Sequence, residues 1–131
     1  MGERAGDHTS VAGPERVALV GLVSGRAGRL DAEQSLEELA GLAAAAGARV
    51  TLRVLQERAR PHAATFLGSG KIQELAESCV AAGIDLIVFD NELTPSQLRQ
   101  ISEVVERKVL DRTHLILDIF AARARDRKSV V

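Results

Sequence analysis

The sequence is poor in aromatic residues and in cysteine, and both shortages narrow what the protein can do. Aromatic side chains make up 2% of the 131 residues, with no tryptophan and no tyrosine. This argues against the base-stacking platforms that single-strand nucleic-acid binders use. Cys79 is the one cysteine, so neither an intramolecular disulfide nor a cysteine-based zinc site can form within the chain.

Long hydrophobic runs and a secretory signal are also missing. No apolar run reaches the roughly 18 residues that cross a bilayer, and residues 1–16 contain no apolar core of the kind that signal peptides have. We therefore expect no membrane partner and a cytoplasmic location. Net charge is −1, from 17 basic and 18 acidic residues, so a nucleic-acid partner would have to be met by a local basic patch.

The length and the 46% hydrophobic content suit one domain with its own core. We expect residues 1–15 to be a flexible leader, because they are polar and rich in glycine. The domain itself is predicted to span residues 16–125. Residues 126–131 are then a tail or the start of a linker.

Hydrophobic patterning predicts four strands with helices between them. Residues 17–23 and 85–89 are, apart from Asp85, continuous apolar runs, which are typical of strands buried on both faces. The alternation in residues 48–56 indicates an edge strand instead. A short fourth strand is predicted at residues 108–110. Strands joined through helices run parallel with right-handed crossovers. We therefore predict an α/β fold: a small doubly wound four-stranded parallel sheet, strand order 2-1-3-4, with helices on both faces.

Residues typical of helix ends flank the predicted helices. The predicted starts are Asp31 with Gln34, Ser69, and Thr94 with Gln97, of which the first and third have capping-box spacing. Gly47 and Gly83 are predicted to end the first two helices. The expected apolar stripes are Leu36, Leu39, Ala43 and Ala46 in the first helix, and Ile72, Leu75, Ala76, Cys79 and Val80 in the second. Cys79 is therefore interpreted as a core residue.

The segment FLGSGKIQEL, residues 66–75, resembles a nucleotide-binding loop in outline. A P-loop requires G-x-x-x-x-G-K-[ST]. Thr65 stands where the first glycine is needed, and Ile72 stands where the magnesium-binding hydroxyl is needed. This segment is not a P-loop.

Two interpretations of these glycines remain open. Backbone N–H groups of Gly68, Ser69 and Gly70 at a helix N-terminus attract anions, and Lys71 in the first turn could assist. Alternatively, the glycines only let a long loop turn tightly into the helix.

A ligand site in such a sheet is expected beyond the carboxyl ends of the strands, where the strand order reverses. Here that place lies between the first and third strands. The loops at that edge carry basic side chains, namely Arg26, Arg29, Arg58, Arg60, His62, Lys71 and Arg112, together with the acidic Asp90, Glu92 and Asp111. The edge is either a locally basic binding surface or a set of ordinary solvated loops. Asp90 and Glu92 are turn formers or, as the other possibility, catalytic carboxylates.

Three blocks resemble a known family. ATFLGSGKIQEL, DLIVFDNELTPSQLRQI and KVLDRTHLILDIFAARAR are similar, in order and spacing, to the N-terminal domain of the HflX family of ribosome-associated GTPases, from about Val17 to Arg125. The resemblance implies an α/β N-terminal domain followed by a helical linker and a GTPase domain that uses GTP with Mg²⁺. It also implies the large ribosomal subunit and its RNA as partners, ribosome splitting under stress, and in some members an adenine-nucleotide activity of the N-terminal domain.

The chain departs from the family pattern in two places. Ala63 and Ala64 stand where the family usually has Asp-Pro, and the last block continues into ARARDRKSVV without any P-loop or N-K-x-D motif. We therefore expect this chain to have no catalytic residue, no metal site and no cofactor of its own. It is either a piece of a longer GTPase or a domain that stands alone.

Three hypotheses follow from the sequence. The leading one is a ribosome- or RNA-contacting domain of an HflX-like GTPase. The candidate RNA or anion contacts are Arg26, Arg29, Arg58, Arg60, His62, Gly68, Ser69, Gly70, Lys71 and Arg112. The alternative is an ATP- or GTP-binding domain that uses Gly68–Lys71, with weak or no hydrolysis. The third is a structural domain that packs against its own linker and GTPase domain through an apolar patch on its last helix.

Overall fold

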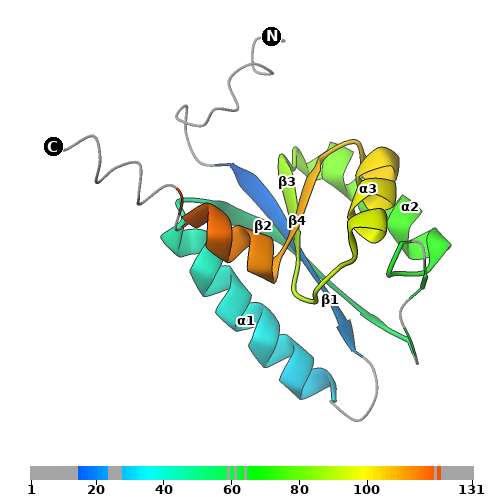
Figure 1. The fold of residues 1–131 in the computed structure, drawn as a ribbon, viewed down its shortest axis with the longest axis horizontal. Helices are drawn as coiled ribbons and strands as arrows, with labels where there is room; N and C mark the ends of the chain where they lie inside the picture. Colours follow the sequence, from blue (N-terminus) through cyan, green and yellow to red (C-terminus); the bar gives the residue numbers. More distant parts are fainter. Residues whose placement is uncertain are drawn as a thin grey trace, which may run out of the picture.

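A parallel four-stranded sheet forms the centre of the computed structural model (Figure 1). The model describes residues 15–23, 28–58, 60, 62–63, 65–119 and 121. The predicted leader up to residue 14, the candidate Arg26 and the predicted tail lie outside the described residues. The strands are β1 (Arg16–Val23), β2 (Arg49–Glu57), β3 (Leu86–Phe89) and β4 (Lys108–Asp111). Their order, β2-β1-β3-β4, confirms the predicted topology.

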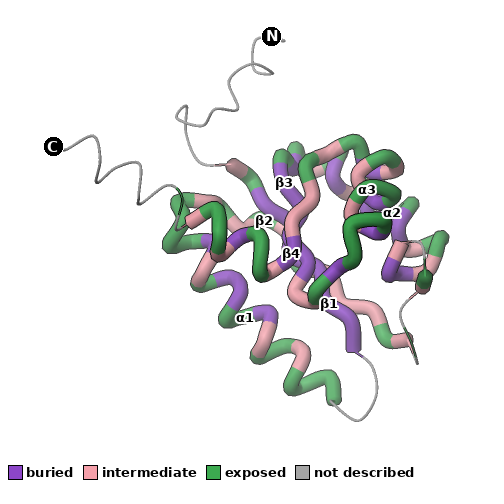
Figure 2. The backbone as a smooth tube through the Cα atoms, viewed as in Figure 1, coloured by how far each residue is buried: buried purple, intermediate pink, exposed green. Residues whose placement is uncertain are grey.

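Burial separates the central strands from the edge strands, as the patterning predicted. Every residue of β3 is buried, and in β1 only the first residue is exposed. Exposed and partly buried residues alternate along the first half of β2, which lies at one edge of the sheet. Figure 2 shows the same contrast, with buried residues concentrated on the two inner strands.

Helices cover both faces of the sheet. The helix α1 (Arg29–Ala45) packs on one face, where Leu36 and Leu39 join the core together with Leu115 from the helical residues 112–119 that follow β4. On the other face pack α2 (Ser69–Ala82) and α3 (Pro95–Val105) (Figure 1). The predicted doubly wound α/β fold is confirmed.

The predicted capping box at the start of α3 is present. Thr94 Oγ1 accepts a hydrogen bond from the Gln97 backbone N–H at 3.0 Å, and Gln97 Oε1 accepts one from the Thr94 N–H, also at 3.0 Å. Pro95 takes the first helical position, where its missing N–H does no harm.

The other two predicted caps were wrong. The N-cap of α1 is Gly28 rather than Asp31, and that of α2 is Gly68 rather than Ser69. Both glycines have the extended backbone that an N-cap requires, with φ of −78° and −64°. The helical conformation therefore begins immediately after them, and the predicted capping residues become part of the first turn.

The apolar stripes are also narrower than predicted. Val80 is 70% exposed, because at 100° per residue it lies about 80° around the helix from Ile72, on the side away from Leu75 and Cys79. Ala46 is exposed because α1 ends at Ala45. Gly83 does end α2, with φ of 67° in the left-handed region that glycine tolerates.

Candidate functional site

The loops at the carboxyl ends of the strands form two separate groups of polar side chains. The loop between β2 and α2 carries the candidates Arg58, Arg60 and His62 and leads to Lys71 in the first turn of α2. Arg112 belongs instead to a cluster formed by β3, α1 and the last helix. The structure therefore does not bring all the candidate residues into one site.

The start of α2 combines a helix N-terminus with a guanidinium group. A β-carbon added to Gly68 would lie 2.8 Å from Arg58 Nη1, so the Arg58 guanidinium rests directly against this glycine. The Gly68 N–H donates to Gln56 Oε1 at 3.1 Å. The next N–H groups of a helix have no partner within the helix, and the helix dipole adds partial positive charge there. The Arg58 guanidinium therefore lies close to the positive end of the helix dipole.

Two further basic residues lie close to this position in the chain. Arg60 is exposed, and its carbonyl accepts a hydrogen bond from Arg58 Nε at 3.0 Å. The Lys71 ammonium lies 3.7 Å from Glu74 Oε1, with 30% of the lysine side chain exposed. We call Arg58, Arg60, Ser69, Gly70 and Lys71 together the α2-start surface.

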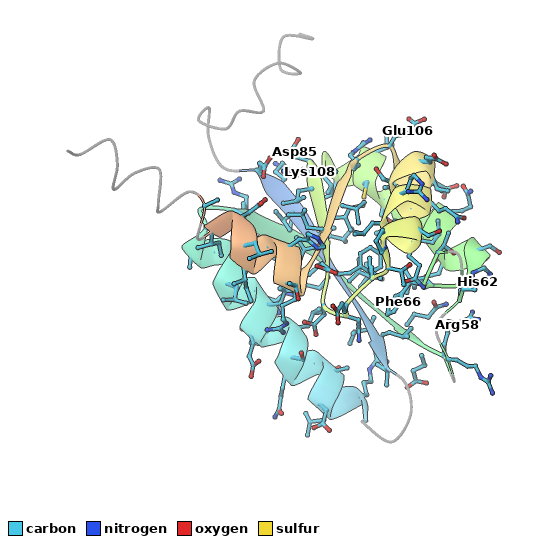
Figure 3. All side chains as sticks on the ribbon, viewed as in Figure 1. Arg58, His62, Phe66, Asp85, Glu106 and Lys108 are labelled. Atoms are coloured by element: carbon cyan, nitrogen blue, oxygen red, sulfur yellow. The ribbon has the colours of Figure 1, made fainter. Side chains whose placement is uncertain are left out.

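A strained residue, Phe66, lies in the chain between the two parts of this surface. His62 and Phe66 exchange two backbone hydrogen bonds, of 2.8 and 2.9 Å, and Phe66 has φ of 69°. A positive φ at a bulky residue costs on the order of 1–3 kcal/mol. The buried Phe66 ring packs edge-on against Phe89, with 5.8 Å between the ring centroids. Figure 3 shows Arg58, His62 and Phe66 on one side of the molecule, close to the start of α2.

Sequence reasoning missed a second role of Gln97. Besides closing the capping box, its Nε2 donates to the carbonyls of His62 at 3.2 Å and Ala63 at 3.3 Å. Only 8% of the residue is exposed. The capping-box spacing was the one sequence signal at this position, and that signal carries no information about a contact 34 or 35 residues away.

Arg112 is held inside the fold. Its Nε and Nη2 donate to Asp90 Oδ1 at 2.9 and 2.6 Å, and Nη2 also donates to the Ser35 carbonyl at 2.9 Å and hydroxyl at 3.1 Å. The guanidinium thus links the last helix to β3 and α1. Asp90 therefore has a structural partner, which favours the structural interpretation of this carboxylate.

Asp111 is a second polar junction, and its importance was not predicted. Its buried carboxylate accepts hydrogen bonds from the backbone N–H groups of Leu93 and His114, each at 3.0 Å, and lies 2.6 Å from His114 Nδ1. Burial by itself raises the pKa of Asp111, but these hydrogen bonds and the nearby imidazole lower it below the usual 3.8. The carboxylate therefore stays ionised at neutral pH.

The remaining candidate, Arg29, has carboxylate neighbours. Its guanidinium lies 3.4 Å from Glu33 and 3.9 Å from Glu57, and these side chains are more than half exposed. Such exposed pairs contribute little to stability. Because Arg29 lies at the start of α1, on the other face of the sheet from α2, it is not part of the α2-start surface.

Among the described residues, no group of three or more His, Cys, Asp or Glu side chains could hold a metal ion. No described helix is long and apolar enough to cross a membrane.

On the last helix, Leu117 is 57% exposed. The residue after it, Asp118, pairs with Lys108 at 3.9 Å.

Comparison with known proteins identifies the family of this domain. Residues 33–121 match the family model described as GTP-binding GTPase N-terminal. The chain belongs to this family. Two similar curated proteins are each named GTPase HflX. The protein of Flavobacterium psychrophilum is 47% identical over 110 residues, covering 84% of this chain, and that of Lacrimispora saccharolytica is 44% identical over 117 residues, covering 89%.

The region that this chain matches is only part of the length of each relative. The chain spans 27% of the length of each of the two. A solved GTP-binding protein of Sulfolobus solfataricus, in complex with GDP, shares the fold with a TM-score of 0.60 at 22% identity, over 82% of this chain and 30% of that one. The family predicted from the three sequence blocks is confirmed: the chain corresponds to the N-terminal domain of HflX.

Proposed function

We propose that this domain contacts ribosomal RNA of the large ribosomal subunit through the α2-start surface. The observation that carries the proposal is the Arg58 guanidinium resting against Gly68 at the N-terminus of α2, with Arg60 and Lys71 close to it in the chain, on a molecule whose net charge is −1. Phosphate oxygens are bound by arginine and lysine side chains and by backbone N–H groups at helix N-termini.

The distribution of charge favours approach from this side. The exposed acidic residues of α1 include Asp31, Glu33, Glu37 and Glu38, and α1 lies on the opposite face of the sheet from α2. Because α1 carries four acidic residues and one basic residue, a polyanion is attracted less to the α1 face than to the α2-start surface. Such an arrangement sets the orientation of a complex as well as its rate of formation.

In the longer GTPase, this contact would be the docking step of a ribosome-splitting, stress-response factor in the cytoplasm. The linker and the GTPase domain would be the intramolecular partners of this domain, and GTP with Mg²⁺ would be hydrolysed in the GTPase domain. The N-terminal domain would then supply binding and orientation and no chemistry.

Co-sedimentation with large ribosomal subunits at about 50 and about 150 mM salt tests the proposal. The test variant carries Arg58→Ala, Arg60→Ala and Lys71→Ala. The control variant carries Arg49→Ala, Arg53→Ala and Lys108→Ala, which removes the same charge from exposed positions elsewhere. We expect the test variant to bind at least tenfold more weakly than the control, with a salt dependence lower by about one unit of slope per lost phosphate contact.

Two outcomes would contradict the proposal. One is that the wild-type domain does not sediment with subunits even at about 50 mM salt, where phosphate contacts are strongest. The other is that the test and control variants bind equally well.

A second candidate function is nucleotide binding at the same place. The uncapped N-terminus of α2 beneath the Arg58 guanidinium fits the phosphates of ATP or GTP. Titration with fluorescent ATP and GTP would show tight binding by the wild type and weaker binding by Lys71→Ala. Equal binding by the two proteins, or binding by neither, would remove this candidate while leaving the RNA proposal intact.

A further inference from the structure

We infer that Gln97 is a positioning residue for the α2-start surface, although it lies on α3 and is 8% exposed. The inference rests on the proposed function, because it concerns how the proposed RNA contact is held in shape. The supporting observations are the two hydrogen bonds from Gln97 Nε2 to the carbonyls of His62 and Ala63, at 3.2 and 3.3 Å.

The two halves of the Gln97 amide act on different parts of the structure. Oε1 accepts from the Thr94 N–H at 3.0 Å and so closes the first turn of α3. Nε2 reaches back to the loop between β2 and α2. The donor half can therefore be removed by substitution while the acceptor half, and with it the helix cap, is retained.

The carbonyls that Gln97 holds lie between the two arms of the α2-start surface. Arg58 and Arg60 precede them, and Lys71 follows them in the chain. The backbone bridge from His62 to Phe66 brings the two arms together, and the His62 carbonyl accepts from the Phe66 N–H at 2.9 Å as well as from Gln97. Gln97 thus anchors the bridge to α3.

This bridge needs an anchor because Phe66 is strained, with φ of 69°. A strained conformation persists only where its surroundings over-determine it. Without the Gln97 donors, the loop would sample other conformations and would have to be ordered again when RNA binds. Order present before binding is a recognised source of affinity.

The substitution Gln97→Glu separates the two roles. Glutamate at this helix position still accepts from the capping N–H, but its carboxylate has no hydrogen to donate to His62 and Ala63. Gln100→Glu is the matched control, because it adds the same charge one turn further along α3 at an exposed residue. Gln97→Met is a neutral second variant that removes the donors without adding charge, although it also removes the Oε1 acceptor of the capping box.

Three measurements on each variant make up the test. We expect Gln97→Glu and Gln97→Met to speed amide hydrogen exchange at Phe66 about tenfold, as for the loss of two modest hydrogen bonds. Their affinity for large ribosomal subunits should fall about three- to tenfold. The salt dependence of binding should stay at the wild-type slope, because no phosphate contact is removed, whereas Arg58→Ala should lower that slope by about one unit. Gln100→Glu should match the wild type throughout.

Unchanged exchange at Phe66 in both Gln97 variants would overturn the inference. Faster exchange with wild-type subunit affinity would also overturn it, and in that case the proposed RNA contact would still stand. If the wild-type domain bound no subunit, the proposed function would fail and the inference would fall with it. Loss of affinity with a lowered salt slope would instead make Gln97 part of the contact surface, which contradicts a positioning role.

Discussion

At the scale of single residues, Asp111 joins the end of β4 to the loop after β3 and to the start of the last helix. It ends β4, accepts the Leu93 N–H from the loop after β3, and accepts the His114 N–H at the start of the last helix. Its pKa is lowered in the folded protein by these hydrogen bonds, against the effect of burial. Because the folded pKa lies below the unfolded one, the carboxylate stabilises the fold at neutral pH, and this contribution is lost as the pH falls through the folded pKa.

Asp111→Asn should therefore lower the free energy of unfolding at pH 7 by about 1–3 kcal/mol, the range for a damaged buried hydrogen-bond set. It should also flatten the acid dependence of stability below a pH of about 4. Urea denaturation at pH 7 and at several lower values measures both effects, with Asp118→Asn as an exposed control. An acid dependence equal to that of the wild type would contradict this account.

At the scale of single residues, the sequence identified the polar and charged side chains but not the groups that they contact. Gly68 and Lys71 were identified by their place at a predicted helix start, which is a local property. Gln97 was recognised as a cap, yet its contact with His62 depends on α3 packing beside the loop that precedes α2. Arg112 was grouped with the loop cations because nothing local shows that Asp90 would take its charge.

At the scale of elements, the helices differ in how they begin. The side chain of Thr94 caps α3, while α1 and α2 follow glycines that have no side chain with which to cap. At Gly28 an added β-carbon would meet no described atom within 4 Å, and φ is −78°. This position therefore accepts a capping side chain without strain.

Gly28→Ser should raise the free energy of unfolding by about 0.5–1 kcal/mol, through a new cap and a less flexible unfolded chain. Thr94→Ala should lower it by about 1 kcal/mol, because one N–H in the first turn of α3 loses its acceptor. Urea denaturation of the two variants beside the wild type provides the comparison. Opposite signs are the expected outcome, and a destabilised Gly28→Ser protein would contradict the uncapped description of α1.

The sequence predicted the helices and strands more accurately than the residues at which the helices begin. Continuous apolar runs identified β1 and β3 as inner strands because both faces of an inner strand are covered by helices. Alternation identified β2 as an edge strand for the converse reason. The predicted N-caps of α1 and α2 lay three residues and one residue too late, since several residues near a helix start can supply an N-cap and only the backbone conformation distinguishes them.

At the scale of the whole molecule, the Arg112 guanidinium links three elements across the fold. It reaches Asp90 after β3 and Ser35 in α1 from the start of the last helix. The side chains of Arg112 and Asp90 are 27% and 9% exposed, so the pair is only partly screened by solvent. Loss of either partner leaves the other with an unmatched charge in a largely enclosed place.

A double-mutant cycle with Arg112→Ala and Asp90→Ala should therefore give a coupling energy of about 1–3 kcal/mol. The exposed pair of Arg29 and Glu33 provides the comparison, with an expected coupling of at most about 0.5 kcal/mol. Equal coupling energies for the two pairs would contradict the structural role given to Arg112.

Hydrophobic patterning determined the fold class and the strand order by itself, and the three sequence blocks determined the family. This was possible because burial on both faces of a sheet demands apolar runs that are visible in one dimension. Only the tertiary structure decided which basic side chains remain available to contact an anionic partner. Arg112 is taken up by Asp90, Arg29 lies on the α1 side, and Arg58 rests against Gly68 at the start of α2. Ion pairing depends on which elements meet, and the linear pattern of charges does not contain that information.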